Sequence, residues 1–111
     1  MDSDKARICV LYDIYGDLLP KSCADFIDMY YNDDLSLSEI AENVGISRQG
    51  VRSGIMHGIK ILSEYESKLS LYEKYKGNNE TVKEIKTELS STALPDDKKE
   101  KIFSLLNKLA Y

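Results

Sequence analysis

The feature that most limits the folds open to this chain is a pair of helix caps joined through a glycine. Ser36 and Glu39 form a Ser-x-x-Glu capping box, in which each side chain accepts a hydrogen bond from the other residue's backbone N–H. Gly45 suits the left-handed residue that ends a helix, and Ser47 suits the cap of the next helix. A short capped helix, a sharp turn and a second capped helix predict a helix-turn-helix.

Apolar residues recur at helical spacing through the rest of the chain. A first helix is expected over about residues 3–15, capped by Ser3, and a second helix is expected to have Pro20 at its first position and to end at residues 32–34. The chain has two prolines and no Asn-Gly or Asp-Gly hairpin signal. We therefore expect an all-α protein.

The helix that follows Ser47 meets no helix breaker before Gly77, so it is expected to run from Arg48 to about Tyr75. Its apolar stripe extends further than a small bundle can cover, through Leu62, Tyr65, Leu69 and Tyr72. Either the C-terminal tail folds back on this stripe, or a second copy of the chain packs there to form a homodimer. The expected domains are residues 1–76, a helix-turn-helix domain that includes the long helix, and residues 77–111, a C-terminal helical tail.

The tail is expected to begin with a linker at residues 76–80 and to contain two short amphipathic helices. Their apolar positions are Val82, Ile85 and Leu89 in the first, and Ile102, Leu105, Leu106 and Leu109 in the second. Neither helix is expected to be stable alone, because each has a single apolar stripe to bury. The tail must therefore lie on the long helix or on a partner.

The charge balance limits the class of partner. The chain carries 15 Lys or Arg against 19 Asp or Glu, a formal net charge of -4. Residues 1–76 hold 9 basic and 13 acidic side chains, whereas residues 77–111 hold 6 of each. Nucleic-acid affinity comes mainly from neutralising phosphates, so this acidic domain needs a concentrated basic patch or a different partner.

Several functional classes are not expected. No apolar run is long enough to cross a bilayer, and the first residues are acidic where a signal peptide is basic, so we expect a cytoplasmic protein without membrane insertion. Cys9 and Cys23 are expected to be reduced thiols, and with His57 as the one histidine no metal site is predicted. We expect no catalytic residues, no cofactor and no enzymatic activity.

A helix-turn-helix that reads nucleic acid presents the first turns of its second helix. The candidate binding residues are therefore those expected to face outward there: Ser47, Arg48, Gln49, Arg52, Ser53, His57 and Lys60. The alternative is that they form the solvated face of an amphipathic helix. Gly50, Gly54 and Gly58 weaken this helix by about 1 kcal/mol each relative to alanine, which indicates either close packing or a lost constraint.

Three stretches resemble the YlxM family of small bacterial proteins: residues 30–34 (Tyr-Tyr-Asn-Asp-Asp), residues 37–42 (Leu-Ser-Glu-Ile-Ala-Glu) and residues 46–49 (Ile-Ser-Arg-Gln). The resemblance covers residues 7–76 well and the tail loosely. It implies a bundle like region 4 of bacterial sigma factors, with a long fourth helix and a helical tail. It also implies an association with the signal recognition particle, through the particle's GTPase, its RNA or both.

The chain differs from the family pattern after Val51. Family members usually continue with a stretch of the type Asp-Asn-Ile-Lys-Arg, where this chain has Ser-Gly-Ile-Met-His at residues 53–57. Two cations are thus replaced by Met56 and His57, which reduces the expected affinity for phosphate. The leading hypothesis is an accessory factor of the signal recognition particle that binds protein or RNA and modulates the GTPase.

Two other functional classes remain open from the sequence. One is a transcription regulator that reads duplex DNA with the helix starting at Ser47, as a dimer through the long helix and tail. The other is an interaction module that binds no nucleic acid and uses the apolar stripe of the tail. The sequence does not choose between a monomer and a homodimer.

Overall fold

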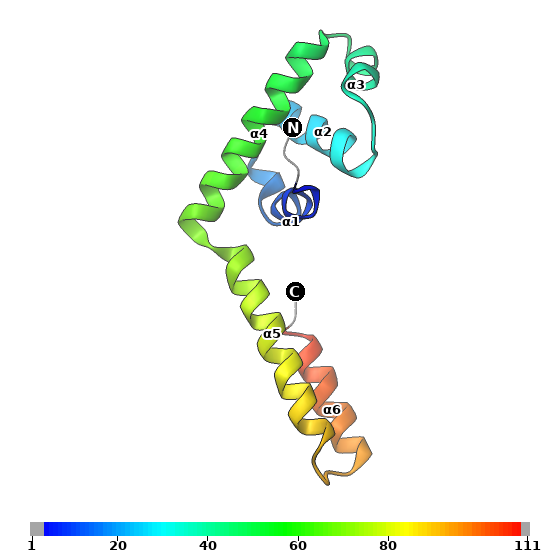
Figure 1. Ribbon diagram of the computed structural model, residues 1–111, viewed down its shortest axis with the longest axis vertical. Helices are drawn as coiled ribbons and strands as arrows, with labels where there is room; N and C mark the ends of the chain where they lie inside the picture. Colours follow the sequence, from blue (N-terminus) through cyan, green and yellow to red (C-terminus); the bar gives the residue numbers. More distant parts are fainter. Residues whose placement is uncertain (1–3, 110–111) are drawn as a thin grey trace. The chain divides into compact units, whose positions relative to one another are not determined.

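The computed structural model describes residues 4–109, and within them it has helices and turns but no strand (Figure 1). The all-α prediction is therefore confirmed. The chain divides into an N-terminal unit that ends at Ser70 and a C-terminal unit that begins at Leu71. The elements in order are α1 (Lys5–Tyr15), the 3-10 helix η1 (Gly16–Leu18), α2 (Lys21–Ile27), the π-helix η2 (Asp28–Asn32), α3 (Leu37–Val44), α4 (Arg48–Leu69), α5 (Leu71–Ser90) and α6 (Asp96–Asn107).

The starts of α1 and α2 each lie close to the predicted positions. Ser3, the expected cap of the first helix, lies outside the described residues, and Asp4 is the N-cap instead, with its carboxylate accepting the N–H of Arg7 at 3.1 Å. Pro20 precedes α2 as its N-cap rather than standing first within the helix. Its missing N–H costs nothing at either position, because the first N–H groups of a helix have no partner within it.

In the N-terminal unit, α4 is the helix on which the other three pack (Figure 1). The fully buried side chains come from all four helices: Ile8, Leu11, Tyr15, Ile27, Ile40, Val51, Ile55 and Leu62. The inward face of α4 is apolar, because Val51, Ile55, Ile59 and Leu62 recur at helical spacing and are all buried. These apolar side chains supply the main stabilising free energy of the unit.

Two glycines let α2 approach α4 closely. A Cβ atom at Gly54 would lie 2.6 Å from Cδ2 of the Phe26 ring, and one at Gly58 would lie 2.5 Å from Cδ1 of Ile27. Both distances are shorter than any normal contact between carbon atoms, so a methyl group at either position fits only if the Phe26 ring or the Ile27 side chain moves. Of the two explanations that the sequence left open for these glycines, close packing is the correct one.

A buried polar contact joins α1 to the far end of α4. The hydroxyl of Tyr15 donates a 2.7 Å hydrogen bond to Oε1 of Glu66, and both side chains are buried. The ring of Tyr65 stacks on that of Tyr15, with centroids 5.8 Å apart. The Tyr15 ring is therefore buried and its hydroxyl is hydrogen-bonded.

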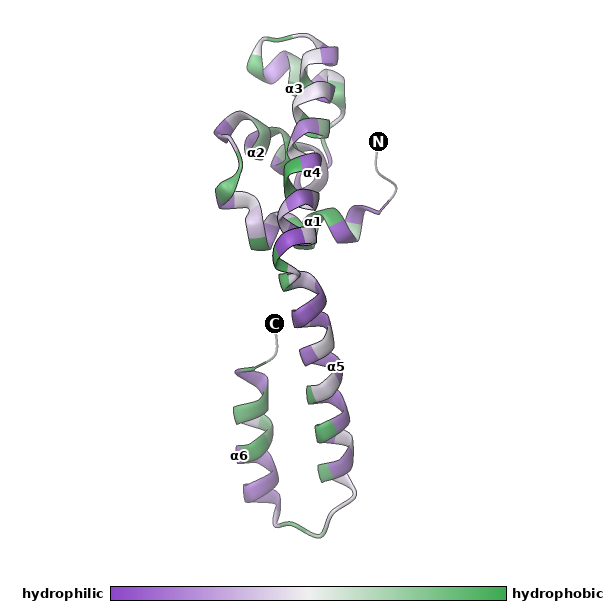
Figure 2. Ribbon diagram, turned by 90° about the vertical axis from the view of Figure 1, so that its left-hand side faces the viewer, coloured by the Kyte–Doolittle hydropathy of each residue, from purple (hydrophilic) through white to green (hydrophobic). Residues whose placement is uncertain are grey.

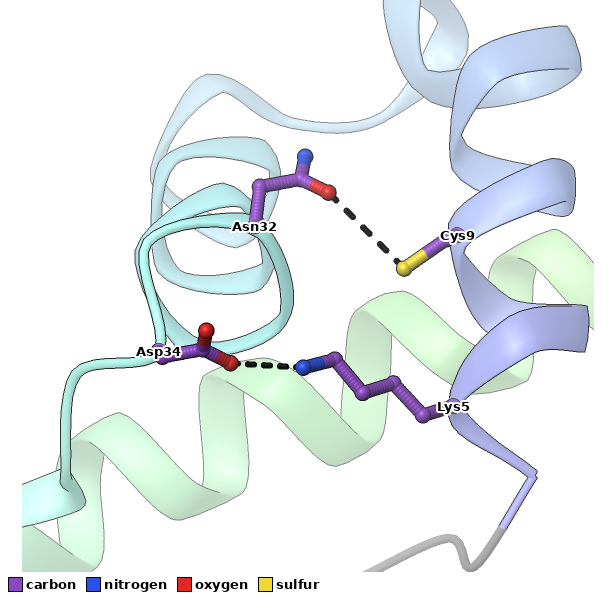
Figure 3. A network of polar contacts seen from close by, with 4 residues as sticks. All are labelled: Lys5, Cys9, Asn32 and Asp34. Atoms are coloured by element: carbon purple, nitrogen blue, oxygen red, sulfur yellow. Dashed lines mark hydrogen bonds and ion pairs between the residues drawn. The ribbon is translucent and has the colours of Figure 1, made fainter.

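The segment between η2 and α3 is tied back to α1 (Figure 3). Nζ of Lys5 donates to Oδ1 of Asp34 at 2.6 Å, and Sγ of Cys9 lies 3.7 Å from Oδ1 of Asn32. The bond to Asp34 raises the pKa of the Lys5 amine, although solvent screens the exposed pair. Asp34 thus serves to hold a turn, in which it has a positive φ of 56°.

The prediction that the fourth helix continues to about Tyr75 is wrong. The helix ends at Leu69, and Ser70 adopts the left-handed conformation with φ 54°. The last buried residue of α4 is Glu66, and Leu69 is 46% exposed, so packing within the N-terminal unit no longer supports the helix at this point. The expected boundary after residue 76 lies inside α5.

The proposed homodimer surface changes accordingly. Leu62 is fully buried within its own chain and Tyr65 is partly covered by Tyr15, so neither offers a free apolar face. Leu69 and Tyr72 belong to different helices. The homodimer itself stays a prediction.

In the C-terminal unit, α5 and α6 form a helical hairpin. The predicted linker at residues 76–80 is helical, because a lone Gly77 costs only about 1 kcal/mol within a 20-residue helix. Figure 2 shows hydrophobic and hydrophilic residues alternating along both helices, as the amphipathic pattern predicts. Val82 of α5 is buried where that helix packs on α6, and Leu106 of α6 is buried where it packs on α5. Leu105 and Leu109 are exposed.

Among the described residues, none of the helices has both the length and the apolarity that a membrane span requires.

The glycine contacts predict opposite effects of alanine at two kinds of position. Gly54→Ala and Gly58→Ala should each destabilise the protein by about 1 to 3 kcal/mol, because the new methyl group forces buried neighbours to move. Gly77→Ala is the control, since a Cβ atom there meets nothing within 4 Å, and it should stabilise α5 by up to about 1 kcal/mol. Urea denaturation followed by circular dichroism measures all three. Unchanged midpoints for Gly54→Ala and Gly58→Ala would contradict the packing described here.

Candidate nucleic-acid or partner interface

The capping box predicted at the start of α3 is present. The N–H of Glu39 donates to Oγ of Ser36 at 3.1 Å, and the N–H of Ser36 donates to Oε1 of Glu39 at 3.0 Å. These two bonds lower the pKa of the Glu39 carboxyl, with the bond from the Ser36 backbone as the larger cause. They satisfy two N–H groups that the helix itself cannot.

The turn and the second cap also match the prediction. Gly45 is left-handed, with φ 73°, and its N–H donates to the carbonyl of Ala41 at 2.9 Å. Oγ of Ser47 then accepts the N–H of Gly50 at 3.0 Å, which caps α4. The direction in which α4 leaves the turn is therefore set by one backbone hydrogen bond and one serine cap rather than by a flexible loop.

All seven predicted binding residues lie on the surface of the unit. Ser47 caps α4, and the remaining six are exposed side chains along the helix: Arg48, Gln49, Arg52, Ser53, His57 and Lys60. The structure thus confirms that they face outward, and what they bind stays a prediction.

Five exposed residues of α4 follow one another at helical spacing and form a continuous face. We call this face the α4 stripe, and it comprises Gln49, Arg52, Ser53, Met56 and Lys60. Nε2 of Gln49 lies 3.5 Å from Oγ of Ser53 within it. Arg48 and His57 flank the stripe, each four positions from one of its members.

Met56 is the member that the sequence prediction left out. It lies four residues after Arg52 and four before Lys60, and its side chain is 41% exposed. Its spacing from the two cations was the signal that could have identified it.

Three cations on or beside the stripe are available to a partner. Within residues 4–109, none of Arg48, Arg52 and Lys60 forms an ion pair. The unit that carries them is acidic, because residues 1–70 hold seven Lys or Arg against twelve Asp or Glu. The basic character is therefore local to α4.

Some of the acidic side chains gather around Tyr12, on α1, η1, α2 and the start of η2. The pKa of the Tyr12 hydroxyl is raised, first by burial and then by the negative charges of Asp28, Asp25, Asp17 and Asp13. A phosphate would be repelled from that face. On α3, Glu39 and Glu42 are also exposed, and this helix carries no Lys or Arg.

The described residues offer no sign of a metal site, since no three His, Cys, Asp or Glu side chains lie together among them. Cys9 and Cys23 are both free thiols, the second of them buried. His57 is exposed on α4.

The Glu39 cap predicts a pH dependence of stability. A carboxyl whose pKa is lowered by folding contributes stability above its ordinary value of 4.5, and this is lost as the pH falls through the lowered value. Glu39→Gln keeps an acceptor oxygen but does not titrate. The difference in unfolding free energy between Glu39→Gln and the wild type should therefore shrink as the pH falls from about 7 to about 3.5.

Ser36→Ala provides the comparison, because it removes the other half of the cap and should cost about 1 kcal/mol. Urea denaturation at the two pH values measures both variants. A Glu39→Gln difference that stayed constant with pH would show that the charge of Glu39 does not stabilise α3.

The chain matches the profile of a family described as "Putative helix-turn-helix protein, YlxM / p13 like" over residues 3–102. A relative from Limosilactobacillus reuteri, named UPF0122 protein, is 41% identical over 82% of this chain and 80% of its own length. Relatives of the same name from Clostridium kluyveri and Anoxybacillus flavithermus are 44% and 35% identical, over 74% and 93% of this chain and 74% and 94% of their own lengths. Together with the capped α3–turn–α4 geometry, these matches show that the chain belongs to the YlxM / p13-like family of helix-turn-helix proteins.

Proposed function

We propose that this protein is a non-enzymatic, cytoplasmic accessory factor of the signal recognition particle. It binds the particle's GTPase, its RNA or both through the α4 stripe and the flanking Arg48, and it modulates the GTPase. The observation that carries the proposal is that Arg48, Arg52 and Lys60 are exposed and form no ion pair within residues 4–109, although the surrounding unit is acidic. The family resemblance supplies the identity of the partner.

Two further observations support a binding role for this face. The caps at Ser36 and Ser47 hold the starts of α3 and α4 through hydrogen bonds from backbone N–H groups to the serine hydroxyls, so the side chains of the stripe start from a rigid helix. A rigid surface loses less conformational entropy on binding than a mobile loop. The exposed charges also favour rapid association with an oppositely charged partner.

The proposal predicts the effect of removing two cations. The double variant Arg48→Ala/Arg52→Ala should bind the reconstituted particle about tenfold or more weakly, because both side chains lie at the proposed contact. The matched control is Lys21→Ala/Lys68→Ala, which removes the same charge from exposed positions of the same unit. Titration with the purified particle, its GTPase alone and its RNA alone measures the effect. The proposal is wrong if none of the three shows saturable binding.

A second candidate is a regulator that reads duplex DNA. It is favoured by the capped start of α4, where Arg48, Gln49 and Arg52 are exposed in the first turns, as in helices that enter the major groove. This candidate predicts DNA affinity that falls steeply with salt and weakens in Arg48→Ala and in Arg52→Ala. A fluorescence titration over a salt series tests it, and insensitivity to both substitutions would exclude it.

A further inference from the structure

We infer that the α4 stripe docks a protein surface, one with acidic side chains around an apolar pocket that receives Met56. The inference rests on the proposed function and makes it more specific, because it assigns the contact to the GTPase of the particle rather than to its RNA.

The centre of the stripe is apolar. Met56 lies between Arg52 and Lys60 on one helix face and is 41% exposed, although a thioether side chain gains free energy from burial. Protein interfaces are enriched in Met and Arg at their cores. Met is also flexible enough to fill a pocket of irregular shape. A helix face that carries a methionine with a cation four residues away on each side therefore has the composition of a protein-binding surface.

The neighbouring helix does not fit a nucleic-acid backbone. In a helix-turn-helix bound to a duplex, the first helix crosses the backbone, and half or more of the hydrogen bonds go to phosphate and sugar. Here that helix is α3, which has no Lys or Arg and exposes Glu39 and Glu42. Its position would bring carboxylates towards phosphates, and this repulsion opposes binding.

The turn adds apolar rather than basic surface. Val44 ends α3 and Ile46 lies in the turn, and both are more than 40% exposed. The turn leads directly to Arg48 and the first residues of the stripe. Exposed apolar side chains around a helix start favour a partner that can bury them, which a row of phosphates does not do.

The charges of this end of the unit define the partner's chemistry. Arg48, Arg52 and Lys60 require carboxylates opposite them, and Glu39 and Glu42 favour a basic side chain near α3. Such a mixture of both signs around an apolar anchor is available on a protein surface and not on a nucleic-acid backbone. The occupant is therefore a protein whose docking surface is acidic where it meets α4.

The test compares two components of the particle separately, the GTPase freed of RNA and the RNA alone. Met56→Ala should weaken binding to the RNA-free GTPase about tenfold, because it removes the side chain at the centre of the contact. Met56→Lys should weaken the same binding at least as much, and it should leave RNA affinity equal or higher because it adds a cation. Both variants place good helix formers at an exposed position, so the fold is retained.

Leu69→Ala is the matched control, since Leu69 is a similarly exposed apolar residue of α4 outside the stripe. It should bind the GTPase like the wild type. The inference is overturned if the Met56 variants bind the GTPase normally while Arg48→Ala/Arg52→Ala binds the particle weakly, and the proposed function then stands. It is also overturned if Met56→Ala weakens RNA binding alone. Absence of binding to either component would remove the proposed function and this inference together.

Discussion

The N-terminal unit depends on the close approach of α2 to α4. Because Gly54 and Gly58 have no side chain, Phe26 and Ile27 occupy space that a methyl group would otherwise fill. This contact, together with the burial of the apolar residues of α4, keeps one side of the helix in the core and leaves the opposite side available to solvent. The exposed stripe is therefore the reverse side of a packed helix, and a change at either glycine disturbs the packing that holds it.

The parts of the fold that the sequence predicted are those controlled by local hydrogen bonds. The caps at Ser36 and Ser47 and the left-handed Gly45 are decided within a few residues, and all three occur where expected. The outward position of Arg48 and Arg52 follows from the periodicity of the helix. Met56 was omitted because residues were selected by polarity, whereas its proposed role depends on its place between two cations.

The parts that the sequence did not predict depend on tertiary contacts. The stretch around Ser70 contains neither glycine nor proline, so nothing local indicated the break, and the apolar pattern continued across it. The end of α4 follows from where burial stops after Glu66, which periodicity does not reveal. Conversely, Gly77 signals a break but lies within α5, because the penalty of one glycine is small beside that of ending a long helix.

The glycine packing also separates residues that maintain the fold from residues that we propose to contact a partner. Positions 54 and 58 are restricted by α2, whereas the side chains of the α4 stripe project from the helix into solvent. Substitutions along the stripe therefore carry little folding penalty and can accumulate independently of the core. A scaffold of this kind can exchange one partner for another through a few surface changes, and family members that share the fold can differ in what they bind.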